Sequence, residues 1–116
     1  MKIKKVRRLI IEIFLKYKLT KKHSEICADA LINAELVGAP AHGLARIASY
    51  CNRIKKKVIN PSPKIKIKKI SSSITCIDAD NAVGFIGAKL GINYAIKNAK
   101  KNGIGFVAVK NSGHYG

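Results

Sequence analysis

The sequence has no tryptophan, few aromatic residues and very little acidic charge. Aromatic residues make up 6% of the 116 residues, and 23 lysines and arginines stand against 6 aspartates and glutamates, which gives a formal net charge of +17. Surfaces that read or stack on nucleic-acid bases rely on arginine and aromatic side chains. Lysine dominates here and is spread along the whole chain. We therefore expect no specific nucleic-acid partner, and a small basic nucleic-acid-binding domain is the alternative interpretation.

Cysteine is scarce, and long apolar runs are absent. Cys27, Cys51 and Cys76 are far apart and form no C-x-x-C pair, which argues against a disulfide framework and a metal site. We expect them to be small buried side chains. The basic start and the apolar residues 9–15 look like a signal peptide, but Glu12 interrupts the run and no cleavage site follows. We therefore expect a cytoplasmic protein with no membrane partner.

Nucleotide-binding fingerprints are also missing. Gly84, Gly87 and Gly91 are spaced for helix packing and do not form G-x-G-x-x-G after a strand. Gly103 and Gly105 precede a predicted strand, which is the wrong order. The sequence contains neither a P-loop nor a nucleophile elbow. It therefore assigns no cofactor-binding residue.

Hydrophobic periodicity predicts three helices in the first half of the chain. The first follows residues 6–17. The second starts after Thr20, a plausible N-cap, and ends at Gly38. His23 lies in this helix without a polar partner near in sequence, so we expect it on the surface. A third helix is predicted over residues 42–57, and its polar side carries three basic side chains: His42, Arg46 and Arg53.

The second half of the chain predicts a mixed α/β structure. Alternating lysine and isoleucine predict a half-buried strand over residues 64–68. The other elements that we expect, in chain order, are a strand at residues 74–77, a loop at 78–84, a fourth helix ending at Asn102-Gly103 and a strand at 104–109. The last strand is apolar throughout, which is typical of a strand covered on both faces. The pattern predicts a β-strand pair followed by a βαβ unit.

The proline-bearing residues 60–63 mark the boundary between these halves. We expect an N-terminal helical segment over residues 1–59 and the start of a mixed α/β domain over residues 60–116. A strand covered on both faces requires neighbours at both edges, and little sequence follows residues 104–109 to supply them. We therefore expect the chain to be an incomplete and inactive fragment.

The first polar cluster with chemical potential lies at the predicted start of the third helix. His42 and Arg46 are four residues apart, so they would share one face at a helix N-terminus, which attracts anions. Arg46 offers a planar fork for a carboxylate, and His42 can gain or lose a proton near neutral pH. An enzyme that acts on a small hydroxy or keto acid needs both a carboxylate-binding group and a group that transfers a proton. The alternative is an ordinary solvated helix face.

The second polar cluster, residues 110–116, follows the predicted buried strand. Open α/β sheets bind ligands at this end of their strands. His114 is a candidate general acid/base, Asn111 and Ser112 can donate and accept hydrogen bonds, and Gly113 permits close approach of a ligand. The alternative is a turn that contains an incidental histidine.

Both clusters, in this order, resemble motifs of the malate/L-lactate dehydrogenase family, which lacks a Rossmann fold. That family shows G-x-x-S-H-G-x-x-R after two helices, a proline-bearing linker, and later a G-I-G strand that ends in N-S-x-H-[FY]-G. The matching positions in this sequence are Gly38, His42, Gly43, Arg46, Pro61, Pro63, Gly103, Ile104, Gly105, Asn111, Ser112, His114, Tyr115 and Gly116. One departure is Ala41, where the family usually has serine.

The resemblance implies an oxidoreductase that transfers a hydride between NAD or NADP and a small 2-hydroxy acid. It implies that His114 is the general acid/base, that Arg46 anchors the substrate carboxylate, and that His42 is a second active-site imidazole or a competing candidate for the proton. It also implies a homodimer, with most cofactor-binding residues beyond the equivalent of Gly116. If so, these three side chains should line one cleft between the two halves or meet across a dimer interface.

Overall fold

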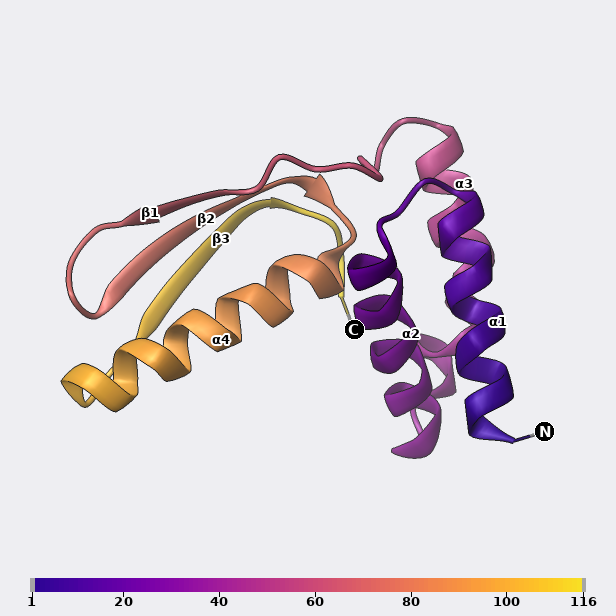
Figure 1. Cartoon of the computed structure of the whole chain (residues 1–116), viewed down its shortest axis with the longest axis horizontal. Helices are drawn as coiled ribbons and strands as arrows, with labels where there is room; N and C mark the ends of the chain where they lie inside the picture. Colours follow the sequence, from indigo (N-terminus) through magenta and orange to yellow (C-terminus); the bar gives the residue numbers. More distant parts are fainter. Residues whose placement is uncertain (1, 116) are drawn as a thin grey trace.

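The computed structural model describes residues 2–115 as a helical part joined to a sheet with one long helix (Figure 1). In chain order the elements are α1 (Ile3–Lys16), α2 (Lys21–Leu36), the 3-10 turns η1 (Pro40–His42) and η2 (Leu44–Arg46), α3 (Ile47–Lys55), β1 (Lys66–Lys69), β2 (Ile74–Ala82), α4 (Gly84–Asn102) and β3 (Phe106–Ser112). The predicted α/β class is confirmed: three N-terminal helices precede a strand pair and a βαβ unit. Across residues 2–115 no helix is long and apolar enough to span a membrane.

The first two helices form where the apolar spacing predicts them. The Thr20 hydroxyl accepts a hydrogen bond from the His23 backbone N–H at 3.2 Å, which confirms the N-cap of α2. Gly38 adopts φ = 78° just past the end of α2, a conformation that glycine tolerates without strain. Phe14 of α1 and Leu31 of α2 are fully buried in the core between these helices. Each such side chain contributes about 1.5–3 kcal/mol of hydrophobic stabilisation.

The third helix is shorter than predicted. It begins at Ile47, and residues 40–46 form two 3-10 turns instead of a first α-helical turn. Gly43 separates the turns with φ = −97° and ψ = −137°, which breaks the helical path. The apolar spacing of Leu44 and Ile47 fits a 3-10 turn as well as an α-helix, because both place residues three apart on one side. The predicted helical position of His42 and Arg46 is therefore wrong, although Arg46 directly precedes α3.

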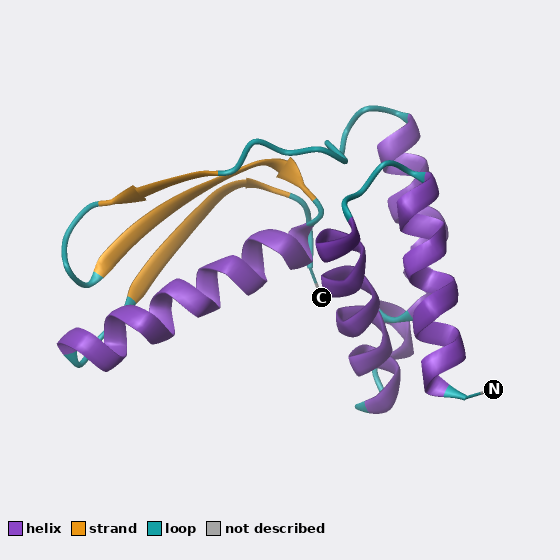
Figure 2. Cartoon of the chain, viewed as in Figure 1, coloured by secondary structure: helices purple, strands orange, loops and turns teal. Residues whose placement is uncertain are grey.

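The sheet has the order β1-β2-β3, with β1 antiparallel and β3 parallel to β2. The helix α4 forms the crossover and lies along one face of the sheet (Figure 2). The strand β2 continues to Ala82, so the loop predicted over residues 78–84 is wrong. The reason is an irregularity in its pairing with β3 in which Asp80 and Asn81 adopt positive φ. Aspartate and asparagine are the residues that tolerate this conformation best after glycine, so a turn-like sequence stays within a strand.

The last strand is an edge strand of this sheet, not one covered on both faces as predicted. Val107 and Val109 face α4 and are half-buried, whereas Phe106 on the opposite face is 62% exposed. The first strand is exposed along its length and starts at Lys66, two residues later than expected. A continuous apolar run cannot distinguish one covered face from two, because both faces of the strand carry the same kind of side chain.

Candidate active site

His114 follows β3 in a short segment that packs against the start of α4. The Gly113 backbone N–H donates a hydrogen bond to the Ala82 carbonyl at 3.0 Å, which ties this segment to the end of β2. Gly84, the first residue of α4, lies against the carbonyls of Gly113 and His114, and a Cβ at Gly84 would collide with both. Gly84 is thus required for the close approach that positions His114.

His42 reaches the same region from the helical part. It ends the turn η1, and its backbone N–H donates to the Ala39 carbonyl at 2.9 Å. The ring centroids of His42 and His114 lie 6.4 Å apart, with 43° between the ring planes. Two imidazoles that are distant in the sequence are therefore neighbours in the structure.

A pocket of about 330 Å³ lies between α3 and the segment after β3. The residues that line it are Arg46, Ser49, Tyr50, Arg53, Ile59 and His114. Arg46 and His114 therefore share one pocket between the helical part and the mixed part, as predicted for these two residues, but His42 does not line it. His42 lines a neighbouring pocket of about 260 Å³ beside α2 and meets this site through its contact with the His114 ring.

One face of α3 forms a wall of this pocket. The wall begins at Arg46 and continues three, four and seven residues later with Ser49, Tyr50 and Arg53. This spacing places the four side chains on one side of a helix. The sequence placed Arg53 on the polar side of the helix but gave it no role, and it gave Ser49 and Tyr50 none either. The same spacing rule that finds buried stripes could have identified this polar one.

Tyr50 is the buried member of this wall. It is 7% exposed, and its ring meets Phe85 of α4 edge-on at 5.6 Å between centroids. Burial raises the pKa of the Tyr50 hydroxyl, while the positive charges of Arg46 and Arg53 act against this rise. The phenol is therefore a neutral hydrogen-bonding group that lies within the electrostatic reach of two guanidinium groups.

The other polar residues of the second motif have structural contacts. The Asn111 side-chain amide donates to Asp78 Oδ1 at 3.1 Å, and the Ser112 hydroxyl donates to the Gly113 carbonyl at 3.1 Å. The hydrogen bond from Asn111, followed by one from the Asp80 backbone N–H, lowers the pKa of Asp78. Neither Asn111 nor Ser112 lines the pocket. They hold the segment that carries His114, whereas the sequence suggested them as ligand-binding groups.

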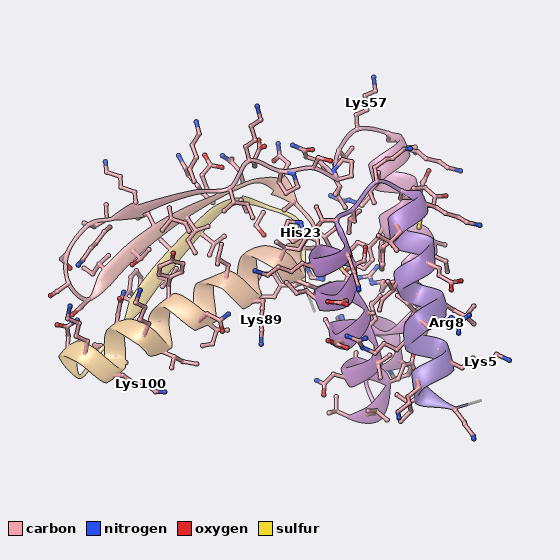
Figure 3. The ribbon with its side chains drawn as sticks, viewed as in Figure 1. Lys5, Arg8, His23, Lys57, Lys89 and Lys100 are labelled. Atoms are coloured by element: carbon pink, nitrogen blue, oxygen red, sulfur yellow. The ribbon has the colours of Figure 1, made fainter. Side chains whose placement is uncertain are left out.

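His23 does not lie on the surface as expected. It is half-buried in the first turn of α2 (Figure 3), and its Nδ1 is buried without a hydrogen-bond partner among residues 2–115. Burial lowers the pKa of His23. The absence of a polar partner near in sequence therefore does not place this ring on the surface.

The start of α4 is not a phosphate site of the Rossmann type. Nucleotide-binding α/β folds place a phosphate at the N-terminus of the helix that follows a strand. Here the corresponding start of α4 is occupied by the carbonyls of Gly113 and His114. Among residues 2–115 no cluster of three or more histidine, cysteine, aspartate or glutamate side chains could hold a metal ion. The pocket lined by Arg46 and His114 is thus large enough for a small acid.

Comparison with known proteins agrees with this architecture. The chain is 37% identical to L-sulfolactate dehydrogenase from Methanocaldococcus jannaschii over 110 residues, which cover 95% of this chain and 32% of that protein. It is 36% identical over 107 residues to malate dehydrogenase from Pyrococcus abyssi, covering 92% and 30%. The solved structure of the Methanocaldococcus jannaschii sulfolactate dehydrogenase matches with a TM-score of 0.96 at 36% identity, over 100% of this chain and 34% of that one.

A second solved structure, malate dehydrogenase from Pyrococcus horikoshii, matches with a TM-score of 0.94 at 32% identity, over 98% of this chain and 33% of that one. The chain thus spans about a third of the length of the relatives that it matches. The family model described as malate/L-lactate dehydrogenase matches residues 1–116. On this match and these identities, the chain belongs to the malate/L-lactate dehydrogenase family.

Proposed function

We propose that the chain forms the substrate-binding and proton-transfer part of an oxidoreductase that interconverts a small 2-hydroxy acid and its 2-oxo acid with NAD or NADP. The observation that carries the proposal is the pocket that Arg46 and His114 share. The names of the relatives support it, since they include L-sulfolactate dehydrogenase, malate dehydrogenase and an NAD(+)-dependent ureidoglycolate dehydrogenase.

The chemistry of the pocket suits this reaction. Oxidation of a 2-hydroxy acid removes a proton from the hydroxyl oxygen and a hydride from the carbon that bears this hydroxyl, and the hydride would go to the nicotinamide. The carboxylate is on the adjacent carbon. Arg46 can bind the carboxylate through paired N–H groups, while the His114 ring accepts the hydroxyl proton. In the reverse direction His114 returns that proton. We assign no residue of this chain to the nicotinamide group.

His114 is our choice for the proton transfer, with His42 as its neighbour. His114 lines the pocket together with Arg46, whereas His42 lines the adjacent pocket and lies 6.4 Å from His114 between ring centroids. In this assignment His42 helps to orient the His114 ring or contacts the substrate from the side. A side chain that transfers a proton works best when its neighbours restrict its rotation.

The family resemblance also leads us to propose a homodimer and a cytoplasmic location. We also divide the chain into a helical segment, residues 1–59, and the start of a mixed domain, residues 60–116. The pocket supports this division, because α3 forms one side and His114 the other.

The nucleic-acid alternative has less support. The labelled basic side chains are spread over both parts of the molecule: Lys5 and Arg8 are on α1, Lys57 follows α3, and Lys89 and Lys100 are on α4 (Figure 3). A binding face for a phosphate backbone would gather such side chains on one side. The cluster of His42, Arg46 and His114 instead favours an enzyme.

A chimeric enzyme tests the proposal. The chain would replace the matching first third of the Methanocaldococcus jannaschii sulfolactate dehydrogenase, and oxidation of 2-hydroxy acids would be measured with NAD and NADP. We expect activity that falls by roughly 10²–10⁴-fold in His114→Asn and by less in His42→Asn. A folded chimera that oxidises no 2-hydroxy acid would contradict the function, and an unchanged rate in His114→Asn would contradict the role of His114.

A further inference from the structure

We propose that Arg53 binds a second acid group of the substrate, so that the pocket selects 2-hydroxy acids with two anionic groups. In such a substrate Arg46 binds the carboxylate beside the hydroxyl-bearing carbon. Arg53 binds a carboxylate or sulfonate attached to the next carbon of the chain. This inference rests on the proposed function and makes Arg53 a specificity-determining residue. A monoanion such as lactate lacks the second group.

The geometry of α3 places both guanidinium groups at one pocket. Arg46 directly precedes the helix, and Arg53 follows seven residues later, close to two full turns. Their Cα atoms are therefore about 10 Å apart along the axis and on the same side of the helix. Both residues line the pocket, one at each end of the wall formed by Ser49 and Tyr50. Two long side chains can thus approach a small ligand from its two ends.

The charges in the pocket have no internal partner. No carboxylate is among the residues that line it. Within residues 2–115 neither Arg46 nor Arg53 forms an ion pair, whereas Arg7 pairs with Asp29 and Arg8 pairs with Glu12. Both free guanidinium groups are close enough to the Tyr50 hydroxyl to affect its ionisation. The pocket therefore holds two positive charges and nothing negative to balance them.

Two unbalanced guanidinium groups favour a ligand with two negative charges. Like charges in a partly buried pocket repel each other, and a doubly charged ligand removes this repulsion at both ends. A monoanion that occupies Arg46 leaves Arg53 without a partner. Arginine also matches the planar carboxylate and the trigonal oxygens of a sulfonate through paired N–H donors. The selectivity thus follows from the number of guanidinium groups and not from the size of the pocket alone.

The test is a ligand titration of the 116-residue chain, which requires no cofactor. L-malate and L-lactate serve as probes, and the ionic strength is held at about 0.15 M so that the overall charge of the chain is screened. The arginine side-chain N–H signals of Arg46 and Arg53 and the ring signals of His114 report binding in NMR spectra. We expect L-malate to bind at least about tenfold more tightly than L-lactate.

Four variants locate the effect. In Arg53→Gln, the affinity for L-malate should fall to the level of the affinity for L-lactate, while the affinity for L-lactate stays the same. In Arg53→Lys, which keeps the charge, part of the preference should return. Arg46→Gln should weaken both acids. Lys100→Gln removes one positive charge at the exposed end of α4 and is the matched control that should leave both affinities unchanged. Because Arg53 is exposed, its replacement should not affect folding, which dispersed amide spectra would verify.

The outcomes separate the two proposals. Equal affinities for the two acids, or an equal loss of affinity in Lys100→Gln and Arg53→Gln, would overturn the role of Arg53. The proposed function would still stand in that case if the NMR signals of Arg46 and His114 respond to the acids. If neither acid moves the signals of Arg46 or His114, the proposed site is wrong and the inference about Arg53 is overturned with it.

Discussion

The carboxylate of Glu35 in α2 accepts a hydrogen bond from the Leu44 backbone N–H at 2.8 Å, and it occupies the space that a side chain at Gly43 would need. This contact fastens the turns that carry His42 and Arg46 to the second helix. It explains in physical terms why a glycine stands directly after His42: the approach of Glu35 leaves no room for a Cβ.

Replacement of Gly43 by alanine should therefore break this hydrogen bond. We expect Gly43→Ala and Glu35→Ala each to lower the free energy of unfolding by about 1 kcal/mol. The double variant should lose clearly less than the sum, because both changes remove the same interaction. Urea denaturation of the four proteins measures this, and strictly additive losses would show that the two changes do not act through one shared contact.

Gly84 should be less tolerant than the other glycines of α4. In Gly84→Ala the new Cβ meets the carbonyls of Gly113 and His114, which belong to the backbone and cannot rotate away. We expect a loss of about 1–3 kcal/mol in the free energy of unfolding and displaced ring signals of His114 in NMR spectra.

The matched control for Gly84 is Gly91→Ala in the middle of the same helix. Its Cβ would lie 3.3 Å from a methyl group of Val109, which can adjust. The change should stay within about 1 kcal/mol, because alanine also favours the helix. Equal effects at the two positions would contradict the proposed role of Gly84 in positioning His114.

Local sequence rules were sufficient where one short segment determines its own structure. The N-cap at Thr20 depends on a hydroxyl and an N–H three residues away, and it is confirmed. The end of α4 at Gly103 is confirmed by φ = 83° at that residue. The shared pocket of Arg46 and His114 was predicted through the family resemblance, since nothing in the local sequence requires those residues to meet.

The rules failed where distant groups decide the outcome. The break between His42 and α3 depends on Glu35, nine residues before Leu44. The continuation of β2 through Asp80 depends on partners in the linker, because its carboxylate accepts hydrogen bonds from the Asn60 side chain and the Lys64 backbone N–H. A role for Arg53 does not follow from the sequence for another reason, because polar helix faces are usually only solvated.

The half-buried His23 should make stability depend on pH. Burial lowers its pKa in the folded state below the ordinary value of about 6.5. As the pH falls through the unfolded value, the unfolded chain binds the proton first, so folding becomes less stable; above that pH the ring is neutral in both states and the effect disappears. Urea midpoints between about pH 5 and 8 should show this trend, and His23→Gln should reduce it. His42→Gln, at an exposed ring, should keep the trend.

The three thiols should differ in reactivity. Cys27 is fully buried, which raises the pKa of its thiol to about 12, and burial also raises the pKa of Cys51. Cys76 is half-buried on the face of β2 opposite α4, since Thr75 and Ile77 on either side of it are buried. A thiolate-selective reagent at pH 8 should therefore modify Cys76 first. Cys76→Ser should remove the fast phase and Cys27→Ser should keep it; a fast phase that survives Cys76→Ser would contradict the assignment.

The two edges of the sheet have opposite characters. The β1 edge carries Lys66, Lys68 and Lys69, and lysines along an edge discourage pairing with another strand. The β3 edge carries Phe106 and the apolar residues that follow it, and in residues 2–115 no strand pairs with its outer side. The two edges therefore differ in their ability to pair: the lysines of β1 discourage a further strand, whereas β3 can accept one. Extension of this layer, whether by a longer polypeptide or by another molecule, is therefore favoured at β3.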